Sequence, residues 1–284
     1  MKAIIVAGGK GERLRPFTDT TPKPMLEVGG KPILFHTVDL LKSHGVKDFI
    51  IALCHLPEKV VSYFGDGSKF GVRIAYTHED PKNPLGTAGA ITLAKKFIIG
   101  PTQSDAVRGA SEACDQSVCI YTAGANERSN EEMRRLRKSY IKESFIVTYA
   151  DIVRELDVTK MIEGHKKTKA FATLNVYKRE GPDPKSMIKF DDTNRILEFI
   201  ERPTVKDTRG EPVFVNGSFY VLEPEIFDFI PESLKSDFGA DIYPKLLASK
   251  KALYAYPTTG YFIDIGNLQK LESARKTFHP PRQF

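Results

Sequence analysis

The chain has 284 residues, which is enough for one large domain or two small ones with an ample hydrophobic core. Its hydrophobic content of 41% and charged content of 27% are ordinary for a soluble globular protein. The net charge of +6 is spread along the chain apart from a basic cluster at 134–138, so it suits small anionic substrates and offers little support for nucleic-acid binding.

The cysteines and the apolar runs bear on where the protein works. Cys54, Cys114 and Cys119 have no metal-ligand spacing, and a small, odd number of cysteines favours reduced thiols. The sequence has neither an apolar run long enough to cross a membrane nor a charged leader followed by an apolar stretch. We therefore expect a cytoplasmic protein that does not enter membranes.

Residues 3–7 are a short apolar run that predicts a buried strand. Three glycines and three cations follow it at once. They are Gly8, Gly9, Gly11, Arg13, Arg15 and Lys23. Glycine lets the backbone turn tightly and approach a ligand closely, because no Cβ is in the way. A strand, then a glycine turn, then cations is how α/β proteins hold phosphate, so we expect this loop to bind a nucleoside triphosphate.

The loop differs from two common phosphate-binding motifs. It lacks the Gly-Lys-Ser/Thr ending of a Walker A loop, and Leu14 replaces the third glycine of a dinucleotide fingerprint. It resembles instead the signature of the sugar-1-phosphate nucleotidylyltransferases, Gly-Gly-x-Gly-(Thr/Ser)-Arg-Leu-x-Pro-x-Thr, at residues 8–18. The Lys-Pro-Met segment that follows this signature in the family is present at residues 23–25.

The resemblance implies a reaction. Family members condense a nucleoside triphosphate with a sugar 1-phosphate and release pyrophosphate, using Mg²⁺ and no covalent enzyme intermediate. By this match Arg13 grips the triphosphate, and Lys23 lies between the α-phosphate and the incoming sugar phosphate, where two anions repel. Glu12 departs from the pattern, since the family usually has a small hydroxyl residue there, and it leaves the phosphate contact at that position open.

The next segments alternate between helix and strand patterns. Residues 32–44 predict an amphipathic helix, 49–53 a strand, 57–64 a short helix and 72–77 a third strand. This order argues for a parallel sheet with right-handed crossovers, in which ligands bind beyond the carboxyl ends of the strands. The glycine loop leaves the carboxyl end of the first strand, as a phosphate site should.

A second glycine motif, Leu-Gly-Thr-Ala-Gly-Ala at 85–90, precedes a predicted helix at 91–98 and resembles the mannose-1-phosphate guanylyltransferase branch most. By this resemblance Gly86 and Gly89 let the backbone approach the nucleobase. Glu79 could accept two hydrogen bonds from guanine and would suit uracil or thymine less well. The alternative is that Glu79 is an exposed loop acid and the glycines cap the helix.

Residues 99–143 fall outside the match. In the family a short connection joins the helix to the next strand, whereas here roughly forty residues intervene. They predict a strand at 118–122 and a helix with a basic face at 130–141. A long insertion of this kind is a solvated excursion, a subunit contact or a lid.

Two acids are candidates for a metal site. Asp151 follows a predicted strand at 145–149, where the family has Gly-Asp, with Ala150 in place of the glycine. A carboxylate at this end of a strand is well placed to hold Mg²⁺. Asp264 lies in Gly-Tyr-Phe-Ile-Asp-Ile-Gly, which matches the family's Gly-Tyr-Trp-x-Asp-x-Gly, and the resemblance implies that it is the second metal carboxylate. The Thr-Tyr-x-Asp motif that ends at Asp151 also resembles the glucose-1-phosphate cytidylyltransferases.

Two later motifs suggest a sugar pocket. Glu201-Arg202-Pro203 matches the family's Glu-Lys-Pro, in which the acid holds sugar hydroxyls and the cation holds the sugar phosphate; arginine for lysine changes a point charge into a planar fork. A strand at 215–222 resembles the family's Asn-x-Gly-x-Tyr, which places Asn216 and Gly217 along the pocket, although Asn-Gly is also a common turn. The remaining predicted elements are a helix at 158–167, a strand at 170–176, a helix from 241 and a helix at 268–276.

The implied fold is α/β: a Rossmann-like, mostly parallel sheet flanked by helices, of the glycosyltransferase-A-like nucleotidyltransferase type. We expect one domain over 1–284, with a nucleotide-binding half at about 1–155, interrupted by the insertion at 99–143, and a sugar-binding half at about 156–284. No hexapeptide repeat follows, so we expect no C-terminal β-helix.

The leading functional prediction is an Mg²⁺-dependent mannose-1-phosphate guanylyltransferase, with a nucleoside triphosphate and a sugar 1-phosphate as its partners. A glucose-1-phosphate enzyme that uses CTP, dTTP or UTP follows closely. A catalytically silent nucleotide-sugar sensor or regulatory subunit is a rival from another class. Nucleic-acid binding has the least support, because the sequence offers no motif of aromatic and basic residues. Whether the chain forms a homo-oligomer is left open.

Overall fold

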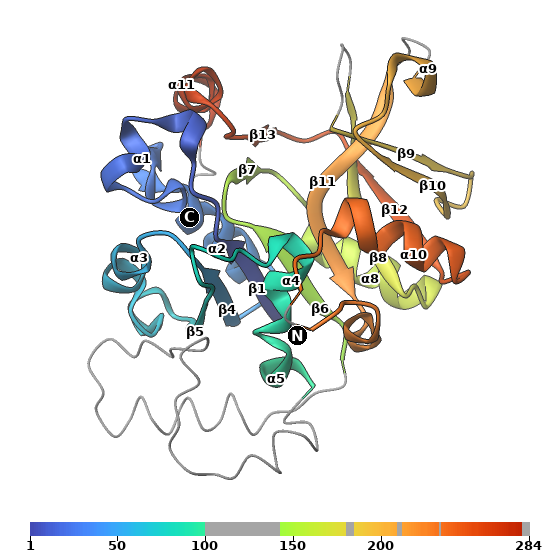
Figure 1. Ribbon diagram of the computed structural model, residues 1–284, viewed down its shortest axis with the longest axis horizontal. Coiled ribbons are helices and arrows are strands. Elements are labelled where there is room, and N and C mark those ends of the chain that lie inside the picture. The colour runs from blue at the N-terminus through green and yellow to red at the C-terminus, as the bar shows by residue number, and fades with distance from the viewer. Residues whose placement is uncertain (100–142, 180–184, 209–211, 233, 280–284) are drawn as a thin grey trace.

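The computed structural model describes residues 1–99, 143–179, 185–208, 212–232 and 234–279 (Figure 1). The strand and the helix predicted within the insertion lie outside these residues. Within the described part of the chain, no helix has both the length and the apolar character needed to span a membrane.

The N-terminal half supplies four parallel strands of the main sheet. They are β1 (Lys2–Ala7), β4 (Asp48–Leu53), β5 (Arg73–His78) and β6 (Phe145–Tyr149), in the order β6-β1-β4-β5. All four were predicted from their apolar runs, which are typical of strands buried on both faces. Ala7 pairs with Leu53 and Val6 pairs with Tyr149, so the carboxyl ends of β1, β4 and β6 lie side by side.

The C-terminal half extends the same sheet with mostly antiparallel pairing. Its strands are β8 (Ala172–Arg179), β9 (Ser186–Phe190), β10 (Ile196–Glu201), β11 (Val213–Leu222) and β12 (Leu253–Thr258). The long strand β11 joins the two halves, because its last residues pair with β6 on one edge and with β8 on the other, while its first residues pair with β8 and β9. The expected α/β fold with a largely parallel core is confirmed, although β9, β10 and β12 were not predicted, since their runs are short or mixed with polar residues.

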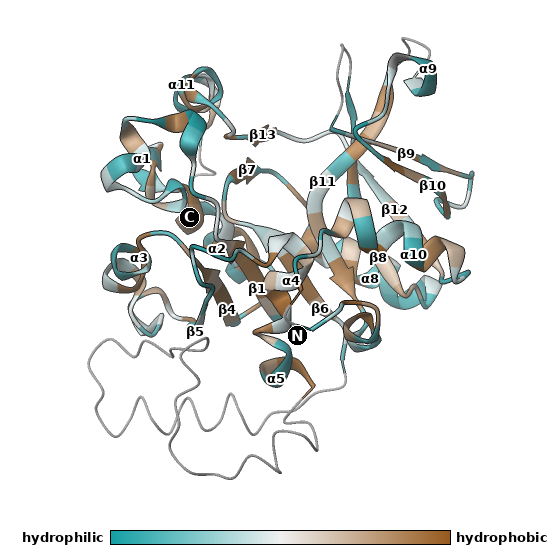
Figure 2. Cartoon of the chain, in the orientation of Figure 1, coloured by the Kyte–Doolittle hydropathy of each residue, from teal (hydrophilic) through white to brown (hydrophobic). Residues whose placement is uncertain are grey.

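Helices cover both faces of the sheet. One face carries α2 (Ile33–Ser43), α3 (Pro57–Phe64) and α8 (Val158–Thr168), and the other carries α4 (Gly86–Thr92), α5 (Lys95–Ile98) and α10 (Tyr243–Ala248). Successive residues of β1 divide between the two cores: Ile4 packs on the α4 side and Ile5 on the α2 side. Figure 2 shows the apolar strands enclosed between these layers.

The C-terminal segment returns to the N-terminal loop. β13 (Phe262–Asp264) pairs with β7 (Ile152–Arg154), and α11 (Leu268–Thr277) packs near the small hairpin of β2 (Glu27–Val28) and β3 (Lys31–Pro32). A third core joins these pieces through buried side chains that include Leu14, Ile33, Val153, Ile265 and Leu271. In Figure 1, α11 lies beside the blue segment that carries α1 (Phe17–Thr20). The glycine loop therefore lies next to the chain that carries Asp264.

Some helix boundaries differ from the prediction. The helix expected at 91–98 is two short helices, and the first begins earlier, at Gly86, because the amides of Ala88 and Gly89 donate to the carbonyl of Ser236. The helix expected from residue 241 begins at Tyr243, after a wider helical turn at Phe238–Ile242. The short helix α9 (Val205–Thr208) was not predicted.

Candidate active site

The glycine loop is closed by a contact with Thr18. Its hydroxyl donates to the carbonyl of Gly11 at 2.8 Å. Gly11 has φ +68°, and a Cβ there would come within 2.8 Å of the Thr18 methyl group, so glycine is required at this position. Gly9 is exposed, with open space where a side chain would be. The loop thus presents bare backbone at the carboxyl end of β1.

Lys23 and Asp151 meet at this edge of the sheet. The Lys23 ammonium lies 2.5 Å from Asp151 Oδ2, and the two side chains are 11% and 33% exposed. Ala150 donates its amide to the carbonyl of Val6, and its methyl group packs in the hydrophobic core. The alanine that replaces the family's glycine therefore does not narrow the space around Asp151.

Asp264 lies beside Asp151, although more than a hundred residues separate them in the sequence. The pairing of β13 with β7 continues past Asp264, where the amide of Ile265 donates to the carbonyl of Asp151 at 2.9 Å. Both carboxylates line one cavity of about 230 Å³. Arg13 is exposed nearby, and its Nη2 lies 3.5 Å from the position that a Cβ on Gly266 would take.

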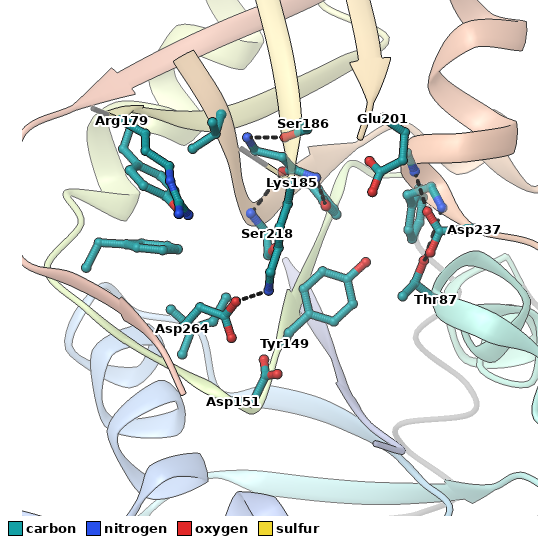
Figure 3. A pocket seen from close by; sticks show the side chains of 18 residues that line it. Thr87, Tyr149, Asp151, Arg179, Lys185, Ser186, Glu201, Ser218, Asp237 and Asp264 are labelled. Carbon is teal, nitrogen blue, oxygen red and sulfur yellow. Dashed lines mark hydrogen bonds and ion pairs between the residues drawn. The ribbon is translucent and has the colours of Figure 1, made fainter. Parts of the chain in front are cut away.

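Cations surround Asp264. The Lys185 ammonium forms an ion pair with it across the cavity, and that of Lys270 lies at 4.0 Å (Figure 3). Burial alone would raise the pKa of the Asp264 carboxyl, but Lys185 above all, with Lys23 and Lys270, holds this pKa below its ordinary value. Asp264 is therefore ionised at neutral pH.

The donor set at this end of the cavity fits Mg²⁺. Mg²⁺ prefers oxygen ligands and is commonly held by one or two carboxylates together with substrate phosphates. Asp151 and Asp264 supply two carboxylates next to a loop with an exposed backbone. No group of three or more metal-binding side chains occurs among the described residues, so substrate oxygens would have to complete such a site.

The cavity is also lined by Glu201, which lies away from Asp264 in Figure 3, and by Asn216. Gly239 allows the Glu201 carboxylate to approach the backbone, since a Cβ there would lie 2.3 Å from Oε2. Burial, and then the neighbouring charge of Asp237, raises the pKa of Glu201. Asn216 is held on both sides: its Nδ2 donates to the Tyr220 hydroxyl at 2.7 Å, and its Oδ1 accepts from the amide of Ser218 at 2.9 Å. Both side chains line the cavity, and their contact with a sugar stays a prediction.

Gly217 is not among the residues that line the cavity, and its place in a sugar pocket stays a prediction. A Cβ on Gly217 would lie 2.2 Å from Asn175 Oδ1, and its carbonyl accepts from the buried guanidinium of Arg154 at 2.5 Å. Arg154 also donates to Ser218 at 3.3 Å, and burial lowers its pKa to about 10. Gly217 therefore contacts the buried Arg154 through its carbonyl. The sequence analysis missed this arginine.

Arg202 is also outside the cavity wall. It is exposed, its backbone is left-handed with φ +50°, and its amide donates to the carbonyl of Lys185 at 2.9 Å. Among the described residues, the basic side chains that line the cavity are Arg179 and Lys185. The sequence analysis missed both, because neither belongs to a motif that the resemblance carried.

Glu79 is buried rather than an exposed loop acid, which rules out that alternative. Its Oε2 accepts from the amide of Leu85 at 2.9 Å, and its Oε1 lies 3.1 Å from the position of a Cβ on Gly8. Burial raises the pKa of Glu79. The carboxylate therefore lies between the glycine loop and the second glycine motif, and one of its oxygens already accepts a hydrogen bond from Leu85.

Gly86 and Gly89 have a close protein neighbour. Gly86 has φ +76°, and a Cβ on it would come within 2.5 Å of the Ser236 carbonyl oxygen; a Cβ on Gly89 would come within 3.0 Å of the Leu234 carbonyl oxygen. Between these glycines, Thr87 donates to Asp237 Oδ2 at 2.6 Å. Packing against the segment at 234–237 is sufficient to explain both glycines, and their contact with a nucleobase stays a prediction.

This geometry combines a glycine loop at the carboxyl end of a strand with two acids and a polar pocket, in an α/β fold. The sequence model of the nucleotidyl transferase family matches residues 2–107 and 116–279. The chain belongs to the nucleotidyl transferase family, and the resemblance seen in the sequence is confirmed.

Two curated relatives are each 30% identical to this chain. One is a UTP–glucose-1-phosphate uridylyltransferase from Synechocystis sp., aligned over 277 residues, and the other is a mannose-1-phosphate guanyltransferase from Yarrowia lipolytica, aligned over 271 residues. Each alignment covers 94% of this chain and 61% of the relative, so the chain spans about three fifths of the length of these proteins.

Solved structures support the same fold. A candidate glucose-1-phosphate thymidylyltransferase from Bacillus anthracis, in complex with sucrose, superposes with a TM-score of 0.71 at 23% identity, covering 97% of this chain and 94% of the other. HddC from Yersinia pseudotuberculosis, complexed with GMP-PN, gives a TM-score of 0.68 at 22% identity, covering 98% and 99% of the two chains.

Proposed function

We propose that the chain is a Mg²⁺-dependent sugar-1-phosphate nucleotidylyltransferase. The observation that carries the proposal is one cavity with Asp151, which pairs with Lys23, and Asp264 at one end and Glu201 at the other (Figure 3), with Asn216 also in its lining. The first end suits phosphates and a hard cation, and the second suits sugar hydroxyls. The family motifs in the sequence and the fold both support this division into a nucleotide side and a sugar side.

In this reaction an oxygen of the sugar phosphate attacks the α-phosphorus of the triphosphate in line. A new oxygen–phosphorus bond forms, the bond to the bridging oxygen breaks, and pyrophosphate leaves with the bonding electrons. Arg13 and Lys23 neutralise the phosphates, and Glu201 and Asn216 orient the sugar. Because no protein group bonds to phosphorus, positioning and charge neutralisation account for the catalysis. Mg²⁺ held by Asp151 and Asp264 would supply further charge neutralisation.

For the substrates, we propose GTP and mannose 1-phosphate first, in line with the motif at 85–90. Two observations favour UTP and glucose 1-phosphate as the second candidate. One carboxylate oxygen of Glu79 accepts from the amide of Leu85, which leaves only the other oxygen for a base. Guanine offers two hydrogen-bond donors on the edge that would face Glu79. A glucose-1-phosphate uridylyltransferase is also as similar to this chain as the mannose-1-phosphate enzyme.

Pyrophosphate release over a grid of nucleoside triphosphates and sugar 1-phosphates, with Mg²⁺ present, tests the proposal. We expect one combination to dominate, and Asp151→Asn to abolish it. Asp192→Asn, which changes an exposed acid in the turn between β9 and β10, is the matched control and should keep full activity. If folded protein releases no pyrophosphate with any pair but binds a nucleotide sugar tightly, the silent-sensor alternative replaces the enzyme.

A further inference from the structure

Acidic side chains outnumber basic ones in the lining of the candidate cavity. Among the described residues that line it, the acids are Asp151, Glu201, Asp237 and Asp264, and the cations are Arg179 and Lys185. A sugar 1-phosphate would add a further anion, and charges interact several-fold more strongly in a protein interior than in water. Its phosphate therefore needs a cationic partner within the cavity.

Lys185 is placed to be that partner. It stands just before β9, and its side chain extends across the cavity to Asp264, as Figure 3 shows. Its side chain is 61% exposed, whereas that of Asp264 is 15% exposed, so the lysine is the more movable member of the pair. A flexible four-carbon stem allows the ammonium group to change partners without a change in the backbone.

The other cations are less well placed. Arg202 lies outside the cavity wall, and its amide is tied to the carbonyl of Lys185. Arg179 is shared with a neighbouring cleft that Lys178 and Lys270 also line. Asp264 keeps the ammonium of Lys270 at 4.0 Å if Lys185 departs, so the acid is not left without a cation.

We propose that Lys185, rather than Arg202, receives the phosphate of the sugar 1-phosphate, and that it leaves Asp264 to do so. The proposal rests on the proposed function. The exchange frees a carboxylate oxygen of Asp264 for a divalent cation. Binding of the sugar phosphate and binding of the metal ion therefore assist each other, and this assistance is reciprocal.

The test uses calorimetry with α-D-mannose 1-phosphate and α-D-glucose 1-phosphate, in the presence of Mg²⁺ and a non-hydrolysable analogue of GTP or UTP. Loss of one charge-assisted contact predicts that Lys185→Met raises the Kd of the sugar phosphate about 10- to 100-fold. Lys185→Arg should restore part of the affinity, and the Kd of the nucleotide analogue should stay the same. Lys189→Met is the matched control, because Lys189 lies on β9 in an exposed ion pair with Glu198 at 2.6 Å.

A second readout is the affinity for Mn²⁺, measured by electron paramagnetic resonance. Without sugar phosphate, Lys185→Met should bind Mn²⁺ more tightly than the natural chain, because Asp264 has lost a competing cation. Equal Mn²⁺ affinities would rule out the exchange. Circular dichroism melting curves of all variants verify that they are folded.

The outcomes separate this proposal from the proposed function. Pyrophosphate release by the natural chain, together with an unchanged sugar-phosphate Kd in Lys185→Met, would overturn the role of Lys185 and leave the enzyme intact. A larger effect of Arg202→Met than of Lys185→Met would also overturn it, as would failure of the natural chain to bind either sugar phosphate. Binding that depends on Lys185 in a chain that turns over no pair would uphold Lys185 and contradict the enzyme.

Discussion

Lys23 and Asp151 form a short ion pair at the place where an incoming phosphate is expected. Lys23 is nearly buried and Asp151 is partly open to the cavity. Such a lysine is held in position by its carboxylate partner before any substrate arrives. Preorganised charge of this kind lowers a barrier more than a flexible cation does, because it need not reorient during the reaction.

Lys23→Met should lower kcat/KM for nucleotidyl transfer about 10²- to 10³-fold, the range found when one preorganised donor is removed. The physical reason is the loss of the cation that separates the two phosphates. Steady-state pyrophosphate release measures this loss. Lys160→Met removes an exposed lysine that also pairs with an aspartate, and it should leave kcat/KM unchanged. Equal activity of the two variants would exclude a catalytic role for Lys23.

At the scale of elements, the start of α4 connects the two halves of the sheet. Its first amides donate to the Ser236 carbonyl, and Thr87 donates to Asp237. This contact fixes one wall of the cavity, since Thr87 and Asp237 both line it. The close approach depends on the missing side chain at Gly86.

Gly86→Ala should lower the free energy of unfolding by at least about 1–2 kcal/mol, the cost of a left-handed backbone with a Cβ. The clash with the Ser236 carbonyl adds to this cost. Urea unfolding measures the change. Gly164→Ala is the matched control: it lies in α8 with no atom within 4 Å of its Cβ position, so alanine should stabilise the protein by about 0.4–1 kcal/mol. A neutral Gly86→Ala would show that the segment at 234–237 is free to move away.

A buried histidine ties α8 to β8 and to the residue that follows β11, at a distance from the proposed catalytic pair. His165 Nε2 lies 2.9 Å from Glu223 Oε1, and its Nδ1 lies 2.8 Å from the hydroxyl of Thr173. A carboxylate can only accept, so neutral His165 donates from Nε2 and accepts from Thr173. Burial lowers the pKa of His165, and Glu223 offsets only part of this effect.

Because this pKa is lower in the folded than in the unfolded chain, the unfolded state binds more protons below pH 6.5. The free energy of unfolding should therefore fall as the pH decreases from about 6.5 and should level off below the pKa of the folded state. Urea titrations between pH 7.5 and 5 measure this slope. His165→Gln should make the slope shallower, and His279→Gln, at an exposed histidine, should not. Parallel slopes in the natural chain and His165→Gln would contradict the assignment.

At the scale of the whole molecule, the sequence predicted the parallel strands and the position of the glycine loop well, because long apolar runs and glycine turns are local signals. The neighbourhood of Asp151 and Asp264 came only from the resemblance, since it depends on the pairing of β7 with β13. No local sequence pattern predicts the pairing of two three-residue strands that lie so far apart in the chain.

The remaining differences have a common physical origin. The role that we propose for Lys185 depends on its side chain extending across a cavity to Asp264. A pattern of residues along the sequence does not predict such a contact. The buried Arg154 donates to the carbonyl of Gly217, and this contact between distant segments has no local signal in the sequence. Gly86 needs to be glycine, yet the neighbour that requires it here is another part of the protein.

The ladder between β7 and β13 also has a consequence for biosynthesis. The glycine loop and Asp151 emerge from the ribosome early, but β13 and α11 emerge only near the end of the described chain. Contacts between segments so distant in sequence form slowly, because a long loop must close first. A nascent chain that has already built β1, β4 and β6 therefore holds half of its acidic pair and only the N-terminal side chains of the third core, and it completes the candidate site only after translation has passed α11.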